Sequence, residues 1–281
     1  MTAVFTHELK SYFRSLTAYV FGAFLLVFTG IGALLYNINA AVSNFEYVLD
    51  FCSIIFVVIV PILTMRVIAE ERKQKTDQLL YSLPITTTQV ILGKYLALLV
   101  VFALPMGIIS FYPLIFAKYG EVSLQTAYGS MAAFFIMGAA LIALGVFISS
   151  LTENQGFAAG IGIAVILLNY FSVTLSEYVS STAFGALVTL AVLIFLLALI
   201  IKLLTKNEYL AYGIGGALFA VLMITYFADM TKLEGLLPKI MTKLSLFKQF
   251  SVFVNGVFDL TALAFFLSVI VFFLFLSVQS L

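Results

Sequence analysis

Long apolar stretches separated by short polar segments recur along the whole chain. A helix that crosses a bilayer needs about 20 mainly apolar residues, and about eight stretches reach that length. Their approximate bounds are 17–36, 51–69, 89–117, 127–151, 156–175, 183–203, 209–228 and 260–280. Few polar residues separate the fifth stretch from the sixth, so six or seven spans also fit. The pattern predicts an all-α integral membrane protein, a polytopic helical bundle of about eight (six to eight) transmembrane helices in one domain over residues 1–281.

Residues 1–16 form a second kind of pattern, with apolar side chains at helical spacing and basic residues between them. The apolar positions are Phe5, Leu9, Tyr12, Phe13 and Leu16. Lys10 and Arg14 lie among them. This pattern is typical of a helix that lies in the membrane interface. A simple basic flank to the first span is the alternative.

The polar segment between the second and third spans, residues 66–88, is the most distinctive feature of the sequence. Its charged part, Glu70 to Asp77, is followed by an apolar patch of leucines, Leu79, Leu80 and Leu83. Pro84 stops a helix, and Thr86 with Gln89 matches a capping box that starts the next span. The segment therefore predicts a short amphipathic helix from Glu70 to Leu83. A solvated charged loop is the alternative.

The segment from residue 229 to 259 is too polar to cross a bilayer easily. Pro238 can open a helix, and one face of that helix would be apolar, with Ile240, Met241, Leu244 and Phe247. Asp259 can cap the last span. We interpret this part of the chain as an external amphipathic segment, with a plain loop as the alternative.

Composition agrees with this pattern. The 281 residues are 63% hydrophobic and 10% charged, with a mean hydropathy of +1.18. Soluble domains carry about 25% charged residues, so most of this surface must face lipid. The net charge of +1 gives no basis for binding nucleic acid.

The distribution of Lys and Arg predicts the orientation of the chain. Nine of these residues fall on one side of the predicted spans: Lys10, Arg14, Arg66, Arg72, Lys73, Lys75, Lys94, Lys202 and Lys206. Five fall on the other side: Lys118, Lys232, Lys239, Lys243 and Lys248. The more basic side faces the cytoplasm in most membrane proteins. We therefore expect both termini to be cytoplasmic.

Several kinds of chemistry are not supported by the sequence. One cysteine and one histidine exclude a disulfide framework and a Cys/His metal cluster. No ionisable residue lies in the middle of a predicted span, which argues against a proton relay. No phosphate-binding loop is present either, because Gly93-Lys94-Tyr95 lacks the preceding glycine and the following hydroxyl residue. No catalytic, cofactor-binding or metal site is therefore expected in this chain.

Three segments together resemble a known family. The stretch from Ala69 to Leu99, AEERKQKTDQLLYSLPITTTQVILGKYLALL, is similar to the cytoplasmic signature of type-2 ATP-binding-cassette (ABC) exporter permeases. SSLTENQ (149–155) resembles that family's junction between the fourth and fifth spans, and Asn255 to Asp259 is similar to the last external segment of its gliding-motility-type branch. Many members have six spans, so residues 183–228 look like an extra helix pair.

The resemblance implies a permease subunit of an exporter in the cell membrane of a bacterium. Two cytoplasmic ABC ATPase subunits would bind ATP and Mg²⁺, and a second copy or a homologous permease would complete the pathway. The contacts with the ATPase would come from the segment 66–88, through Glu70, Glu71, Arg72, Lys73, Lys75, Leu79, Leu80 and Leu83. A second cytoplasmic contact would involve His7, Glu8, Lys10 and Arg14. A membrane scaffold that recruits a cytoplasmic partner, and an ATP-independent channel or transporter, are the alternative functions.

Overall fold

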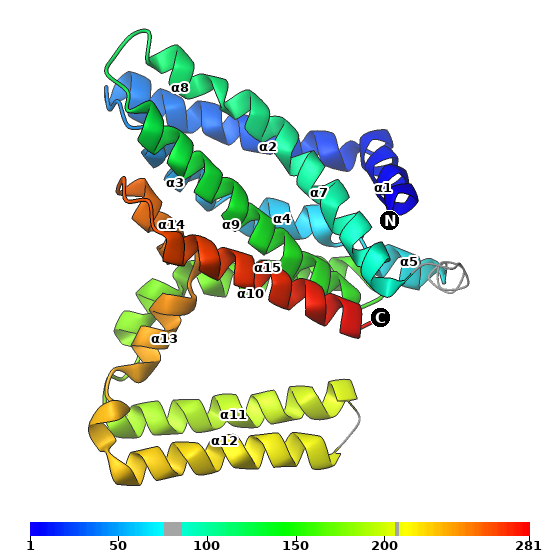
Figure 1. The fold of residues 1–281 in the computed structure, drawn as a ribbon, viewed down its shortest axis with the longest axis vertical. Coiled ribbons are helices and arrows are strands. Elements are labelled where there is room, and N and C mark those ends of the chain that lie inside the picture. Colours follow the sequence, from blue (N-terminus) through cyan, green and yellow to red (C-terminus); the bar gives the residue numbers. More distant parts are fainter. Residues whose placement is uncertain (76–85, 206–207) are drawn as a thin grey trace. The chain divides into compact units, whose positions relative to one another are not determined.

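The computed structural model describes residues 1–75, 86–205 and 208–281, and its regular elements over these ranges are all helices (Figure 1). The predicted all-α polytopic architecture is therefore confirmed. The chain divides into two compact units. Unit 1 comprises residues 1–170 and 246–281, and unit 2 comprises residues 171–245.

The first half of unit 1 is a chain of short and interrupted helices. They are α1 (Thr2–Arg14), α2 (Leu16–Gly32), the π-helix η1 (Ala33–Asn39), α3 (Glu46–Ser53), α4 (Phe56–Thr64) and α5 (Ala69–Gln74). Between α1 and α2, Ser15 is extended, with φ −94° and ψ 160°. This one residue turns the predicted N-terminal helix away from the first span.

The second half of unit 1 contains longer helices. They are α7 (Thr87–Ile109), α8 (Phe111–Phe116), α9 (Leu124–Ser150), α10 (Gln155–Tyr178, which continues into unit 2), α14 (Leu246–Val254) and α15 (Leu260–Gln279). The break between α7 and α8 at Ser110 lies just after Ile109, the residue whose carbonyl the ring of Pro113 would meet in a regular helix. The predicted cap at Asp259 is confirmed, because its Oδ1 accepts the Thr261 N–H at 2.7 Å.

Helix α9 is the centre of unit 1, and it is the most buried of the apolar helices that the structure describes. Aromatic rings join it to its neighbours. The ring of Phe134 lies 4.6 Å from that of Phe56 on α4 and 5.6 Å from that of Phe250 on α14. A small residue allows α4 to come close, since a Cβ at Gly145 would lie only 2.3 Å from Thr64 Oγ1. Large rings at one level and a glycine at another therefore fix how α4 packs on α9.

Unit 2 contains α11 (Ala183–Thr205), α12 (Glu208–Ala228), the 3-10 helix η2 (Met230–Lys232) and α13 (Leu236–Leu244). Helices α11 and α12 pack against each other as a pair. The base of the pair is closed by a hydrogen bond from Gly235 N–H to Ser181 O, at 3.0 Å, and by the buried side chains Ala183, Ala186, Leu222 and Leu233. Pro238 lies inside the first turn of α13, as predicted, but Ser245 separates α13 from α14, so Phe247 is on a different helix from Ile240.

Five described helices are long and apolar enough to cross a membrane: Leu16–Asn39, Thr87–Phe116, Leu124–Ser150, Gln155–Tyr178 and Leu260–Gln279. Two bent pairs bring the number to as many as seven. They are Glu46–Ser53 with Phe56–Gln74, bent by 60°, and Tyr212–Ala228 with Met230–Leu244, bent by 119°. A shorter apolar run, Ala183–Leu196, lies in α11. Counted as one span, the first bent pair begins at Glu46, before the predicted start at residue 51, and includes the carboxylates of Glu46 and Asp50.

Candidate coupling site

Both ends of the chain lie at one end of unit 1, together with α5 and the start of α7 (Figure 1). Helix α7 begins with the capping box that the sequence predicts. Gln89 N–H donates to Thr86 Oγ1 at 3.3 Å, and Thr86 N–H donates to Gln89 Oε1 at 3.4 Å. The capping box fixes where α7 starts. It therefore also fixes the position of Lys94, which lies two turns further along the helix.

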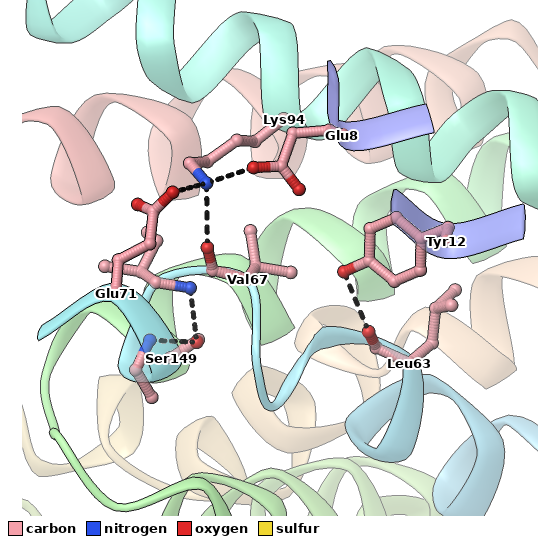
Figure 2. Close-up of polar contacts among 9 residues, drawn as sticks. Glu8, Tyr12, Leu63, Val67, Glu71, Lys94 and Ser149 are labelled. Carbon is pink, nitrogen blue, oxygen red and sulfur yellow. Dashed lines mark hydrogen bonds and ion pairs between the residues drawn. The ribbon is translucent and has the colours of Figure 1, made fainter. Parts of the chain in front are cut away.

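Lys94 is the centre of this end of unit 1. Its side chain is only 2% exposed, and its ammonium Nζ has three acceptors (Figure 2). Nζ lies 2.5 Å from Glu8 Oε1, 2.7 Å from Glu71 Oε1 and 3.1 Å from the carbonyl oxygen of Val67. An ammonium has three N–H donors, so all of them are satisfied. Lys94 thus joins α1, α5 and the turn before α5 to α7.

A glycine allows α1 to reach this lysine. A Cβ at Gly93 would lie 3.2 Å from the Cβ of Val4 and 3.3 Å from the carbonyl oxygen of Met1. These distances are tighter than ordinary van der Waals contact, so a side chain at this position would push α1 away. Gly93 therefore makes room for α1, and the next residue, Lys94, binds α1 through Glu8.

Helix α5 is capped by a side chain from a helix that is distant in sequence. Ser149, fully buried near the end of α9, accepts the N–H groups of Ile68 and Ala69, each at 3.2 Å (Figure 2). Its hydroxyl donates to Met65 O at 3.1 Å. The first N–H groups of a helix have no acceptor within the helix. Ser149 thus supplies the cap that Ile68, the residue at the N-cap position, does not.

The last turn of α5 is connected to the C-terminal end of the chain. Arg72 Nη2 donates to Ser280 O at 2.7 Å, and Ser280 Oγ donates to Ser150 Oγ at 2.5 Å. Within unit 1, α5 is therefore held from three directions: by Lys94 of α7, by Ser149 of α9 and by the end of α15.

Helix α1 has a second set of polar contacts around Tyr12. This side chain is 2% exposed, and its hydroxyl donates to Leu63 O at 3.3 Å (Figure 2). The guanidinium of Arg66 lies over the ring, 5.3 Å from its centre, and Arg66 Nη2 donates to Ser15 Oγ at 2.8 Å. Burial raises the pKa of the Tyr12 phenol above its ordinary value. The hydroxyl is therefore a neutral donor at physiological pH.

Comparison with known proteins now adds to this geometry. A family model described as ABC-2 family transporter protein matches residues 34–181, which is more than half of the chain. The chain belongs to this family. No curated protein sequence matches it. The matched region of this ABC-2 transporter chain includes Arg66, α5, Lys94 and Ser149, while Glu8 and Ser280 lie outside it.

The predicted site residues of this ABC-2 permease divide into two groups. Glu8, Glu71 and Arg72 contact other parts of the same chain, as described above. Glu70 accepts from Gln74 Nε2 at 3.3 Å. The remaining described side chains of the predicted set are exposed: His7, Lys10, Arg14, Lys73 and Lys75. Leu79, Leu80 and Leu83 lie outside the residues that the structure describes.

The single helix that the sequence predicts from Glu70 to Leu83 is interrupted. Helix α5 ends at Gln74, and Lys75 adopts the left-handed conformation, with φ 55° and ψ 25°. A residue in this conformation terminates an α-helix, because the next N–H can no longer reach the carbonyl four residues earlier. The expectation of one continuous helix is therefore wrong at Lys75.

The sequence analysis missed Lys94 and Ser149, the two residues that organise this site in the ABC-2 permease. A weak signal was present for the lysine, since it is the only charged residue within the predicted span 89–117. A buried charge needs partners, so this position could have been used to predict that carboxylates from other segments surround it. No comparable signal identifies Ser149, because a serine near a helix end is common in any membrane protein.

Proposed function

We propose that this chain is the membrane-spanning subunit of an ABC exporter and that it couples to separate cytoplasmic ATPase subunits through residues 66–88. The family supports the permease assignment. The observation that carries the coupling proposal is the buried Lys94, which binds α1 and α5 at once. A segment that served only as a solvated loop would not need to be bound to a buried charge.

The contacts of α5 suggest how a movement would pass into the spans. The exposed side chains of this segment, Lys73 and Lys75, are available to an ATPase, and the leucines at 79, 80 and 83 would be its apolar anchors. Glu71 and Arg72 point inward instead, to Lys94 and Ser280. A push on the outer residues would therefore reach α7, α9 and α15 together. Packed helices of this kind respond by rigid-body shifts rather than by gradual deformation.

The proposed complex contains two ATPase subunits and a second permease, either another copy of this chain or a homologue. ATP and Mg²⁺ would bind to the ATPase subunits, and the pathway for the exported molecule would lie among the permease helices. The predicted orientation, with both termini in the cytoplasm of a bacterium, places α5 on the side where the ATPase is found. The finer assignment to the gliding-motility-type branch rests on residues 69–99, 149–155 and 255–259 and belongs to this proposal.

The experiment is a co-purification of the tagged chain from its native membrane, followed by an assay of the ATPase that copurifies. Leu79→Asp with Leu80→Asp should reduce recovery of the ATPase at least about tenfold, because burying each leucine contributes roughly 1.5–3 kcal/mol and 1.4 kcal/mol is a factor of ten. The matched control is Leu124→Asp, an exposed leucine at the first turn of α9, at the opposite end of unit 1.

Two results would reject the coupling proposal. The first is recovery of the ATPase by the double variant at the level of the wild type. The second is a wild-type chain that is always recovered without an ATPase yet stays monodisperse. Flux in liposomes that contain this chain alone would then favour a channel or secondary transporter. Full function with a partner that cannot hydrolyse ATP would favour a scaffold.

A further inference from the structure

An apolar groove runs along the surface of unit 1 between α2 and α4. Its volume is about 270 Å³. Its lining is almost entirely hydrocarbon and consists of Thr17, Val20, Phe21 and Phe24 from α2, and Ile55, Val58, Ile59, Ile62 and Leu63 from α4 and its start. Val20, Phe24, Val58 and Ile62 are exposed, so the groove opens outward from two membrane-spanning segments.

One end of this groove is polar. Thr17 and Leu63 line that end, and each is hydrogen-bonded to a polar residue just outside it. Ser15 Oγ donates to Thr17 Oγ1 at 3.4 Å, and the Tyr12 hydroxyl donates to Leu63 O. Arg66 contacts both of these residues, over the ring of Tyr12 and at Ser15 Oγ. The apolar groove therefore leads directly to a guanidinium.

Among the residues that the structure describes, this guanidinium forms no ion pair. Within residues 1–75, 86–205 and 208–281, no carboxylate forms an ion pair with Arg66, Arg14 or Lys10. Two carboxylates at this end of unit 1 have other contacts: Glu8 binds Lys94, and Glu70 accepts from Gln74. Arginine presents several N–H donors in a planar fork that matches phosphate oxygens. The mouth of the groove thus presents a guanidinium that no described carboxylate pairs with.

The polar end of this groove is at a depth in the bilayer that suits lipid headgroups. Tyr19, which is 59% exposed, lies beside Phe13 with ring centres 6.1 Å apart, and aromatic residues gather where lipid headgroups begin. From Thr17 to Phe24 the groove extends about 10 Å at 1.5 Å per residue. The hydrocarbon core is about 30 Å thick, so the groove lies within one leaflet. The upper part of an acyl chain fits this length, whereas a spanning helix of a second copy would require contacts through both leaflets.

We propose that this groove binds one anionic glycerophospholipid from the leaflet on the side of the two termini. The acyl chain lies between α2 and α4, and the phosphate accepts hydrogen bonds from Arg66. The lipid would then connect α1, through Ser15 and Tyr12, to the end of α4. This site is independent of the ATPase partner.

The test is a comparison of lipid retention in the wild-type chain. The protein is reconstituted in nanodiscs that contain equal amounts of phosphatidylglycerol and phosphatidylcholine, released into detergent and analysed by native mass spectrometry. Both lipids present a phosphate to Arg66, but phosphatidylcholine also carries a cation that the guanidinium repels. Because a charge interaction at a partly exposed site is worth roughly a factor of five, we expect one phosphatidylglycerol to be retained about fivefold more often than phosphatidylcholine. Equal retention of the two lipids would overturn the proposal without any variant.

Variants then test the headgroup contact at Arg66 and the acyl-chain groove separately. Arg66→Gln should remove the preference for phosphatidylglycerol, while Arg66→Lys should keep part of it. Val58→Trp fills the groove from an exposed position and should lower retention of either lipid. The matched control is Val192→Trp on α11, which is also exposed on an apolar helix and should change nothing. Unchanged retention in Val58→Trp would reject the groove as the seat of the acyl chain.

A second copy of the chain is the competing occupant. Val58→Cys should not form cross-links between copies in membranes if lipid fills the groove. Efficient cross-linking through Val58→Cys would show that another subunit covers this face, and the proposal would be wrong.

Discussion

A lysine ammonium in an apolar surrounding is costly unless each of its donors has an acceptor. Lys94 meets this condition with acceptors from three places in the chain, namely Glu8, Glu71 and the carbonyl of Val67. Removing one member of a buried ion pair is more harmful than replacing the whole pair, because the remaining charge loses its partner. Lys94 therefore stabilises unit 1, and a substitution that removes its charge should destabilise it.

The variant Lys94→Met tests how much the buried ion pairs of Lys94 stabilise unit 1. It keeps most of the length of the side chain but leaves Glu8 and Glu71 without their shared cation. We expect it to destabilise unit 1 by about 3 kcal/mol, at the lower end of the range for a broken buried pair, since both carboxylates are partly exposed. The measurement is the thermal unfolding midpoint in detergent. Lys239→Met, an exposed lysine on α13, is the control and should leave the midpoint unchanged.

A double-mutant cycle distinguishes the ion pair from simple loss of packing. Glu8→Gln should lower the midpoint in the wild-type background. In the Lys94→Met background the same change should raise it, because it removes repulsion between two carboxylates. Additive effects of the two changes would show that Glu8 and Lys94 do not interact.

At the scale of elements, the site depends on close approach between helices and on caps supplied from a distance. Helix α1 lies against α7 because Gly93 has no side chain at the point of contact. Helix α5 has only six residues, Ala69–Gln74, and short helices are marginal without tertiary contacts. Its position is set by Ser149, Lys94 and Ser280 rather than by its own sequence.

Gly93→Val should separate α1 from α7. The added side chain would meet Val4 and the Met1 carbonyl, so α1 would have to move outward and Glu8 would lose Lys94. We expect faster cleavage by trypsin after Lys10 and Arg14 in membranes. Gly107→Val on the same helix is a matched control, because a Cβ there has nothing within 4 Å. Equal cleavage rates in the two variants would contradict this account of α1.

Ser149→Ala should loosen α5. The N–H groups of Ile68 and Ala69 would lose their acceptor, and the cost of losing such a cap is about 1 kcal/mol. Hydrogen exchange at residues 68–72 should become several-fold faster, since 1.4 kcal/mol is a factor of ten. Ser268→Ala is a suitable control because, among the described residues, its hydroxyl donates within its own helix, to Phe265 O. Unaltered exchange at residues 68–72 would show that Ser149 does not stabilise α5.

At the scale of the whole molecule, the two units have separate cores. Unit 1 is built around α9, and unit 2 around the base of the α11–α12 pair. The ends of that pair are close together, since Gly235 N–H bonds to Ser181 O. The pair corresponds to residues 183–228, the segment that the sequence analysis predicts as an addition to the six spans of many permeases of the family.

Excision of residues 183–228 should therefore leave unit 1 folded. Thr182 would join Asp229, and an even number of helices would be removed, so the direction of α15 in the membrane would not change. We expect a monodisperse protein in detergent, with Lys10 and Arg14 cleaved by trypsin no faster than in the full chain. Aggregation, or rapid cleavage within α1, would show that unit 1 depends on this pair.

The sequence by itself determined the apolar spans, the all-helical class and the local starts of α7 and α15. These features depend on residues that are neighbours along the chain, such as Thr86 with Gln89 and Asp259 with Thr261. The ABC-2 family assignment likewise follows from sequence, through residues 34–181.

Only the tertiary structure decided which polar groups meet at the candidate coupling site. Lys94 and Glu8 are 86 positions apart, and Ser149 caps a helix that begins 80 positions earlier. Such partners are chosen by how the helices pack, and hydropathy does not encode that choice. The same holds for the groove between α2 and α4 and for the end of α5 at Lys75. Burial turns a lysine that looked like one more cytoplasmic charge into the centre of the site, because a charge removed from water must find its partners within the fold.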